Sequence, residues 1–394
     1  MRHLFVFIVI LRVIASFFRF DFFFYVLYFF FGAYFLGGLW MDRALRTAEV
    51  RREYTNRAFP GEHVPVRLQV NNRGLLPVPW LQLRESVPIQ LKAPNSVQAV
   101  ISLLPRGRQG VDYALDCRRR GYYHLGPVEL RAGDLFGMLE RTATLPSTDY
   151  LVVYPRVVAL THLGLPAQTP FGSVATRQRL YEDPSRIVGV RDYQSGDSMR
   201  HIHWKTTAAR GTLQVKRFEP AISVQAQLFL NLQRDEYPVA RREPASELAI
   251  VTAASIANYL VEKRQVVGLC SNGSDPLAEV AGTLVLPPRQ GREQLTRLLD
   301  LLARVQLGQS QPFCELLQQA NLHLTWGGTA VVITSDATEE LYPRLLHMVR
   351  SGFHVVLILT DPQSPVAGIR ARVKDVGIAV YDVWEERDLD VWRG

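Results

Sequence analysis

Residues 190–219 read VRDYQSGDSMRHIHWKTTAARGTLQVKRFE, and they combine charged, aromatic and glycine residues with little amphipathic period. Basic and apolar side chains alternate through the middle of this stretch, in the order His201, Ile202, His203, Trp204 and Lys205. A two-residue period is typical of a half-buried β-strand. The pattern therefore predicts a strand with Ile202 and Trp204 on its buried face and the three basic side chains on the other.

A second strand is predicted at the end of the same stretch. Residues 212–218 alternate again, with Leu213 and Val215 expected to point inward. Gly196-Asp197 predicts a tight turn before the first strand, because glycine adopts positive φ readily and aspartate can bond its own backbone. Two short strands joined through residues 208–211 are the simplest interpretation.

Residues 175–220 resemble the signature of a bacterial protein family, the domain of unknown function 58 (DUF58). The residues that carry the resemblance are Arg191, Tyr193, Gly196, Asp197, Arg200, Ile202, Trp204, Lys205, Ala209, Arg210, Gly211, Leu213, Val215 and Glu219. The resemblance implies a hydrophobic amino terminus, a β-rich middle, this signature and a von Willebrand factor A-like α/β domain. It also implies a membrane-anchored protein that accompanies a MoxR-type AAA+ ATPase, and it implies no particular catalytic activity.

The composition bounds the class of protein. At 394 residues with 47% hydrophobic content, the chain is long enough for two soluble domains and an anchor. Its net charge of +8 favours an anionic partner, such as a membrane surface or an acidic protein. Cys117, Cys270 and Cys314 form neither a metal-ligand pair nor an even disulfide set, which predicts reduced, mostly buried cysteines in a cytosolic domain.

Residues 1–45 predict a helical membrane anchor. Residues 22–41 form a run without a charged side chain, and about 20 apolar residues are what a helix needs to cross a bilayer. Residues 4–18 are shorter and contain Arg12, so they are either a compressed first span or an amphipathic segment at the interface. A signal peptide is the alternative for the beginning of the chain, but no small-residue cleavage site follows the first apolar run.

The charges beside the apolar runs predict the orientation of the anchor. In a hairpin of two spans, Arg2 and His3 lie on the same side as the four arginines that follow the second run, Arg43, Arg46, Arg51 and Arg52. The positive-inside bias then places the terminus and the large domains in the cytoplasm, at the inner membrane. The lipid bilayer is therefore one predicted partner, through residues 4–41.

Two different patterns follow the anchor. Residues 50–160 alternate with a period of two, for example at 64–70 and 128–131, which predicts a small antiparallel β-sandwich. Residues 221–394 alternate short apolar strands with helices, which predicts an α/β domain with a doubly wound parallel sheet. Strands are expected at 224–232, 265–270, 330–334 and 355–360, and helices at 246–264, 292–305 and 339–351. The family resemblance names this domain von Willebrand factor A-like.

The resemblance raises the question of a metal site. Metal-binding domains of the von Willebrand factor A type have an Asp-x-Ser-x-Ser loop after the first strand, whose hard oxygen ligands hold a divalent cation. The aligned loop here is Asn231-Leu232-Gln233-Arg234-Asp235, which lacks the leading carboxylate and both hydroxyls and gains an arginine. Asp336 and Asp361 follow two later strands, where they would supply a further ligand. We expect a degenerate, metal-free site at Asn231, Gln233, Asp235 and Asp336, and no cofactor.

Catalytic motifs are scarce in the sequence. His201-x-His203 places two imidazoles on one face of the predicted strand, and Asp197 could complete a three-ligand metal site. A metal-dependent hydrolase using His201 and His203 is therefore the alternative function. The nucleophile elbow, the phosphate-binding loop and the His-Glu-x-x-His helix do not occur in the sequence. We expect a protein without enzymatic activity.

The charged residues of the signature have two interpretations. Ion pairs could fasten the sandwich to the α/β domain, through Arg191, Asp192, Asp197, Arg200, Lys205 and Glu219. Alternatively, the signature is a recognition surface in which cations meet a partner's carboxylates and aromatic side chains act as anchors. The predicted partner-binding residues are Arg191, Asp197, Arg200, Trp204, Lys205 and Arg210.

Together these features predict a membrane-anchored, non-enzymatic protein-interaction scaffold. By resemblance, its partner is a MoxR-type AAA+ ATPase, in envelope assembly, complex maturation or stress response. Nucleic acid is disfavoured as a partner, because the basic residues are interleaved with acidic ones and lack the stacking aromatics of a strand-binding groove.

Overall fold

A computed structural model describes residues 6, 9, 10, 12–14 and 21–390, apart from 92–96, 134–139, 147–148, 161–181, 195–196, 221–224, 279–281, 310 and 321–326. The chain divides into two compact units, Met1–Arg156 and Val157–Gly394. Most of the predicted first span at 4–18 lies outside the described residues.

The first unit begins with the apolar helix α2, Asp21–Arg46. Its segment Phe24–Arg46 has a mean hydropathy of 1.5 and is long enough to cross a membrane. A second helix segment of the chain, Val239–Glu262, is also apolar enough, but 78% of it is buried. Burial identifies that second segment as a core helix, whereas only 6% of the apolar segment of α2 is buried.

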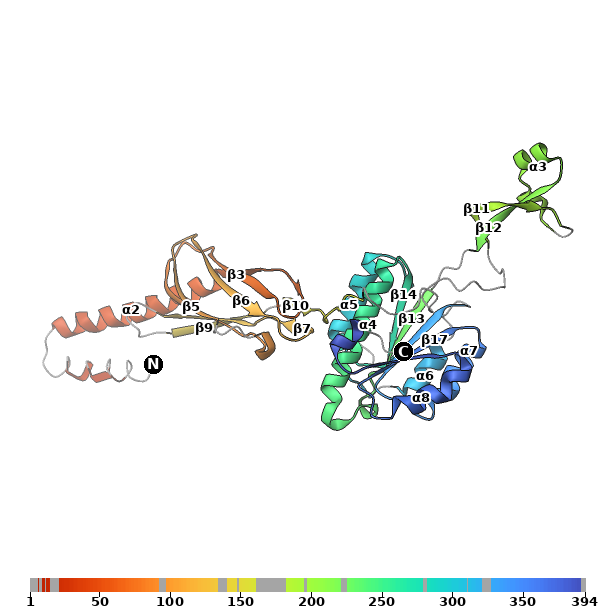
Figure 1. Cartoon of the computed structure of the whole chain (residues 1–394). Coiled ribbons are helices and arrows are strands. Elements are labelled where there is room, and N and C mark those ends of the chain that lie inside the picture. The colour runs from red at the N-terminus through yellow and green to blue at the C-terminus, as the bar shows by residue number, and fades with distance from the viewer. Residues whose placement is uncertain are drawn as a thin grey trace. The chain divides into compact units, whose positions relative to one another are not determined.

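Three small sheets follow α2 (Figure 1). The strands are β1 (Ala48–Glu53), β2 (Arg57–Ala58), β3 (His63–Asn72), β4 (Val78–Glu85), β5 (Gln98–Leu103), β6 (Arg108–Asp116), β7 (Gly121–His124), β8 (Val128–Gly133), β9 (Glu140–Leu145) and β10 (Tyr150–Val153), with a short 3₁₀ turn η1 at Ile89–Leu91. The sheet orders are β1-β3-β6, β5-β4-β8-β9 and β2-β10-β7. All neighbours are antiparallel except β2 and β10.

Alternating apolar side chains build the core of the first unit. In β3 every second residue from Val64 to Val70 is buried, as the period-two pattern predicts. Val70 shares one apolar cluster with Leu81, Leu83 and Leu130, which belong to the sheet of β4 and β8. The two larger antiparallel sheets therefore enclose a common core.

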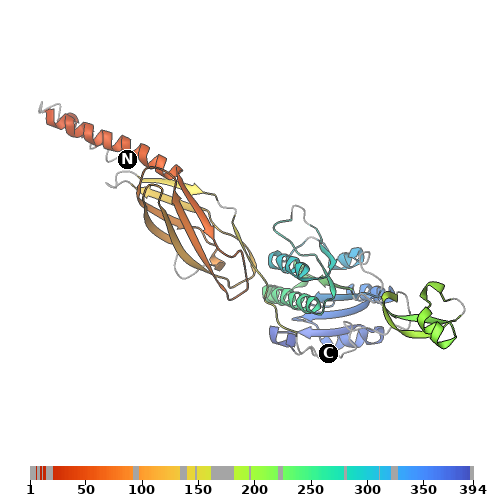
Figure 2. The ribbon, with the colours of Figure 1, turned by 90° about the horizontal axis from the view of Figure 1, so that it is seen from above.

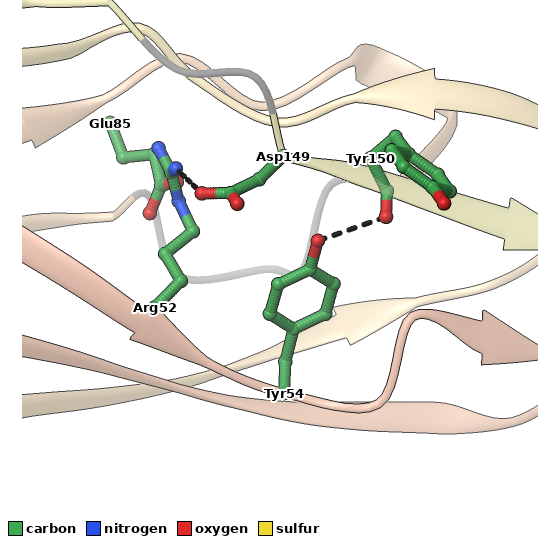
Figure 3. A network of polar contacts seen from close by, with 5 residues as sticks. All are labelled: Arg52, Tyr54, Glu85, Asp149 and Tyr150. Carbon is green, nitrogen blue, oxygen red and sulfur yellow. Dashed lines mark hydrogen bonds and ion pairs between the residues drawn. The ribbon is translucent and has the colours of Figure 1, made fainter.

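A partly buried polar network lies in the first unit (Figure 3). The Arg52 Nε donates to the Glu85 Oε1 at 2.5 Å, and a guanidinium nitrogen of Arg52 bonds the Asp149 carboxylate. The Arg52 side chain is 4% exposed and the Glu85 side chain 0%. Since Arg52 lies on β1, Glu85 on β4 and Asp149 next to β10, the network ties together the three sheets.

The second unit contains the signature as a separate antiparallel pair. Its elements are β11 (Glu182–Asp192), the 3₁₀ turn η2 (Met199–His201), the helix α3 (Trp204–Arg210) and β12 (Gln214–Pro220). We call residues 182–220 the signature hairpin. Strand β11 pairs with β12 in a register that matches Asp192 with Gln214.

The strand predicted at residues 201–205 is wrong, because residues 204–210 form the helix α3. His203 caps its first turn, and Gly211, with φ of 70°, ends it by donating its N–H to the Thr207 carbonyl. Residues 208–211 are thus the end of a helix and not a strand connection. Ile202 is buried and bridges to Val215 as expected, but Trp204 is 66% exposed and Leu213 is 41% exposed, so neither points inward.

The remainder of the second unit is an α/β domain. Its strands are β13 (Gln225–Leu230), β14 (Val266–Ser271), β15 (Leu284–Arg289), β16 (Thr329–Thr334), β17 (His354–Thr360) and β18 (Ala379–Val383). Its helices are α4 (Arg242–Glu262), α5 (Arg292–Arg304), α6 (Phe313–Ala320), α7 (Leu341–Arg350) and α8 (Val366–Val373), and its 3₁₀ turns are η3 (Arg234–Glu236), η4 (Val239–Arg241), η6 (Lys374–Val376) and η7 (Glu386–Asp390). The predicted strands and helices of this domain are confirmed.

The α/β domain has one sheet, in the order β15-β14-β13-β16-β17-β18. The strands are parallel except β15, which forms an antiparallel edge. Phe229, Val332 and Leu357 of the sheet pack with residues of α6, α7 and α8 in one cluster. Figure 1 shows α4 and α5 on the other side of the sheet, so helices cover both faces.

Candidate functional site

An internal ion pair shapes the loop of the signature hairpin. Arg191, near the end of β11, donates two bonds to Asp197, with Nη1–Oδ2 at 2.7 Å and Nη2–Oδ1 at 2.6 Å. The Gln194 N–H donates to the same Asp197 carboxylate at 2.8 Å. These bonds hold the pKa of Asp197 below its usual value. The predicted turn is consistent with the Asp197 N–H, which bonds the Gln194 carbonyl, although Gly196 lies outside the described residues.

The helix α3 is fastened to β12 through Gln214. This side chain is 1% exposed, and its Nε2 donates to the Asp192 carboxylate and to the Thr212 hydroxyl. The Gln214 N–H donates to the Thr207 Oγ1 at 3.0 Å, and its carbonyl accepts from the His203 N–H at 2.8 Å. The hydrogen bonds of Gln214 therefore join β12 to the end of β11 and to α3 within the hairpin.

The two histidines have different structural positions. The Thr206 N–H donates to the His203 Nδ1 at 3.2 Å, and the Thr206 Oγ1 lies 2.9 Å from the same nitrogen. His203 is the helix cap, whereas His201 lies in η2. The premise of the hydrolase alternative, two imidazoles on one strand face, is therefore wrong. Among the residues that the structure describes, no group of three or more His, Cys, Asp and Glu side chains could hold a metal ion.

The outer surface of the hairpin combines apolar and cationic side chains. Met199 is 63% exposed, and Trp204 is 66% exposed. Arg200, Lys205 and Arg210 are exposed, and none of them has an ion pair with any described residue. We call Met199, Arg200, Trp204, Lys205, Arg210 and Leu213 the hairpin surface.

The six predicted partner-binding residues thus separate into two groups. Arg191 and Asp197 form an ion pair with each other within the hairpin. Arg200, Trp204, Lys205 and Arg210 lie on the hairpin surface. Of the ion pairs predicted to fasten two domains together, the structure brings together Arg191 and Asp197, which both belong to the hairpin.

A second candidate region is the edge of the α/β sheet at the carboxyl ends of its parallel strands. Asn231, Asn272 and Asp361 directly follow β13, β14 and β17, and Asp336 lies two residues beyond β16. The strand order reverses at β13, which lies between β14 and β16. Open α/β sheets bind ligands at this kind of edge, next to the reversal.

Asn231 is engaged by the protein itself. Its Nδ2 donates to the Glu236 carboxylate at 2.6 Å and to the Thr334 hydroxyl at 3.0 Å. Its Oδ1 accepts from the Gln233 N–H at 3.1 Å and from the Asn272 Nδ2 at 3.2 Å. Asn231 is 0% exposed, so its carboxamide links β13 to β14 and β16 with no oxygen directed at a ligand.

The other members of the predicted degenerate site also have separate roles. The Gln233 Oε1 accepts from the Phe313 N–H at 3.2 Å. Asp336 accepts from the Ser364 hydroxyl at 2.7 Å and from the Ala337 N–H at 2.9 Å. Asp235 is exposed in η3. Because a hard cation needs several convergent oxygens, these four side chains do not fit a divalent metal ion.

Three residues of this edge were missed in the sequence. Glu236 is half-buried beside Asn231, and burial raises its pKa. The Asn272 Oδ1 accepts from the Leu232 N–H at 2.7 Å. The Arg241 Nε lies 2.9 Å from a carboxylate oxygen of Asp361, a buried residue whose φ is 54°. A polar residue directly after an apolar strand was the available signal for Asn272.

Comparisons with known proteins bear on the signature and on the α/β domain. Residues 189–376 match the model of a family described as "Protein of unknown function DUF58". The chain is 24% identical over 310 residues to the "Uncharacterized protein YeaD" of Bacillus subtilis (strain 168), which covers 77% of this chain and 73% of that protein. The resemblance predicted from the signature is confirmed.

Solved structures are similar to parts of the chain only. A von Willebrand factor type A protein from Catenulispora acidiphila is 10% identical, with a TM-score of 0.32. The matched region covers 45% of this chain and 42% of that protein's chain. The CARDB domain of the PF1109 protein from Pyrococcus furiosus is 15% identical, with a TM-score of 0.20. The matched region covers 27% of this chain and 86% of that domain's chain.

Proposed function

We propose that this chain, whose residues 189–376 match the DUF58 family model, is a membrane-anchored protein that binds a partner protein through the hairpin surface. The exposure of Trp204 is the observation that carries this proposal. Tryptophan and arginine dominate the binding energy of protein interfaces, and Trp204 is 66% exposed among cations that have no ion pair with a described residue. A large aromatic side chain held in this way by a short, internally bonded hairpin is suited to recognition.

The partner is proposed to present carboxylates around an apolar pocket. The cations Arg200, Lys205 and Arg210 favour acidic groups, and Trp204 with Met199 favours an apolar cavity. The family resemblance suggests a MoxR-type AAA+ ATPase, with a role in envelope assembly, complex maturation or stress response. No catalytic role is proposed for this chain, since His203 is occupied as a helix cap.

The anchor is proposed to be α2 in the inner membrane. Its apolar length supports a span, and Arg43 and Arg46 at its end support a cytoplasmic location of the domains that follow. We also infer that the β-rich first unit is a sandwich and that the α/β domain is of the von Willebrand factor A type. The common core of two sheets supports the former inference, and the strand order supports the latter.

The proposal is tested by two substitutions in the full-length, detergent-solubilised protein. Trp204→Ala should weaken partner binding by at least about 2 kcal/mol, as expected for a central aromatic anchor, and Lys205→Glu should weaken it by reversing a charge. The amount of AAA+ ATPase that co-purifies, measured by quantitative mass spectrometry, reports the change.

Matched controls exist on the α/β domain. Trp384 is 45% exposed, and Lys374 is an exposed lysine, so Trp384→Ala and Lys374→Glu make the same chemical changes away from the hairpin. The controls should retain the partner. Two results together would favour the hydrolase alternative over the interaction function. Both hairpin variants would bind the partner as the unaltered protein does, and His203→Ala would abolish a metal-dependent hydrolysis.

A further inference from the structure

The helix α2 continues into the first unit without a linker. Met41, Ala44 and Leu45 at its end belong to the apolar core of the sheets, and Tyr34 packs against the same core. Asp42 accepts a bond of 3.0 Å from the Arg141 Nε, on β9. Figure 2 shows the helix extending from one end of the β-rich unit. The depth at which α2 lies in a bilayer therefore determines how close the attached end of the β-rich unit lies to the membrane.

Two loops are fixed to the end of α2. The loop of residues 73–77 joins β3 to β4, and the loop of residues 104–107 joins β5 to β6. The Arg73 N–H donates to the Thr47 carbonyl at 3.0 Å, and the Arg106 N–H donates to the Gly74 carbonyl at 3.2 Å. The buried Asn72 completes the connection, because its Nδ2 donates to the carbonyls of Leu76 and Leu104.

Each of these two loops contains a leucine whose side chain is unusually exposed. Leu75 is 72% exposed and Leu104 is 74% exposed. The pair lies beside the apolar helix and not at a distant point of the surface. Two exposed leucines at adjacent loop tips do not stabilise a surface that faces water, whereas a membrane would bury them.

Charge at this end of the unit is unbalanced. Arg43, Arg46, Arg106 and Arg108 are exposed, and none has an ion pair with a described residue. The nearby carboxylates of Asp42 and Glu49 are instead paired, with Arg141 and Arg73. Glu140 is an exposed carboxylate here, so the cations outnumber the acidic groups that remain available.

The helix also fixes where these groups lie in a bilayer. About 20 apolar residues span the hydrocarbon core, which places Trp40 at its boundary, where tryptophans gather. The Trp40 Nε1 donates to the Pro77 carbonyl at 2.8 Å, so the loop of residues 73–77 reaches the same depth. Tyr34 lies about 9 Å further along the helix axis and still packs against the core of the unit.

Resting on the membrane anchoring proposed above, we propose that residues 73–77 and 104–107 form a docking rim for an anionic lipid bilayer. Leu75 and Leu104 insert at the boundary of the hydrocarbon core, and Arg43, Arg46, Arg106 and Arg108 bind lipid phosphates. The β-rich unit thus sits against the membrane and does not hang from a flexible stalk. Apolar insertion combined with cationic contacts is the usual mode of interfacial binding.

The test uses the full-length protein in lipid nanodiscs, made of phosphatidylcholine alone or with phosphatidylglycerol. Spin labels are placed by Leu75→Cys and Leu104→Cys, after Cys314→Ser removes the native cysteine that is not buried. Ile89→Cys is the matched control, since Ile89 is 85% exposed in η1, at the opposite end of β4. Phe35→Cys, in an exposed position of α2, reports insertion of the helix itself.

With anionic lipid, labels at 75 and 104 should be accessible to oxygen and protected from a water-soluble nickel chelate, while the label at 89 stays water-accessible. Arg106→Glu and Arg108→Glu should each lower the ratio of docked to undocked label by at least about five-fold, whereas Arg118→Glu at the far end should not. Labels at 75 and 104 as accessible to nickel as that at 89, or equally immersed in both lipid mixtures, would overturn the rim while the helix remains in lipid. A label at 35 exposed to water would instead overturn the anchoring.

Discussion

The network around Arg52 and the hairpin surface both concentrate charge, but they use it differently. The Arg52 side chain is 4% exposed and bonds the buried Glu85 carboxylate and the Asp149 carboxylate, whose side chain is 43% exposed. Arg200, Lys205 and Arg210 are exposed around Trp204 and have no ion pair within the described chain. The difference shows which charges hold a fold and which are available to a partner, although the sequence presents both as clusters of arginine and acid.

Removal of the Arg52 side chain should have the largest effect. Arg52→Ala leaves Glu85 buried without its cation, and breaking a buried pair from one side costs about 3–5 kcal/mol of folding stability. Chemical denaturation of the full-length protein in detergent measures the loss. Arg67→Ala is the control, because the Arg67–Asp112 pair is 58% and 64% exposed and should contribute little. Equal effects from both variants would remove the distinction between the two kinds of charge.

Two neighbouring residues of the signature sharpen the comparison. Ile202 is 2% exposed, so Ile202→Ala should lower the free energy of unfolding by about 2–5 kcal/mol. Trp204 is 66% exposed, so Trp204→Ala should change it by no more than about 0.5 kcal/mol while it weakens partner binding. Thermal unfolding of the two variants decides the assignment. A larger loss from Trp204→Ala would place the tryptophan in a core.

The smallest effect is expected from the pH dependence of the hairpin. Because Arg191 and the Gln194 N–H lower the folded-state pKa of Asp197, the stabilisation that this carboxylate gives is present above its unfolded pKa, about 3.9, and is lost as pH falls through the lower folded value. The protection of the Gln194 amide against hydrogen exchange, relative to its intrinsic rate at each pH, should therefore fall only below about pH 3.9. In Asp197→Asn the loss of protection should already be present at neutral pH, and an unaltered profile in that variant would rule out this role.

The sequence predicted the α/β domain better than the signature for a physical reason. Runs such as residues 355–360 are apolar and bounded by polar loops, so the local sequence alone predicts a strand that is buried on both faces. The order His201 to Lys205 imitates a strand, but a helix forms because His203 accepts from Thr206 and Gly211 adopts positive φ. These capping bonds are decided by three-dimensional geometry, which alternation does not encode.

The same distinction applies to the candidate sites. The loss of the leading carboxylate at Asn231 was visible in the sequence, and the structure adds that its amide bonds Glu236, Thr334 and Asn272. These partners come from three different segments and could be found only in space. In the hairpin, the residue types for recognition were predicted, but the separation of the Arg191–Asp197 pair from the exposed cations required the fold.

Site-specific photocrosslinking in cells tests the central claim most directly. A photoreactive amino acid placed at Lys205 should crosslink the full-length protein to another polypeptide, identified as an AAA+ ATPase by mass spectrometry, while the same group at Lys374 should not. Both positions are exposed lysines, so the comparison isolates the hairpin surface. Crosslinks from position 205 to residues of the same chain, with none to a second protein, would show that the signature is an internal contact and would contradict the account.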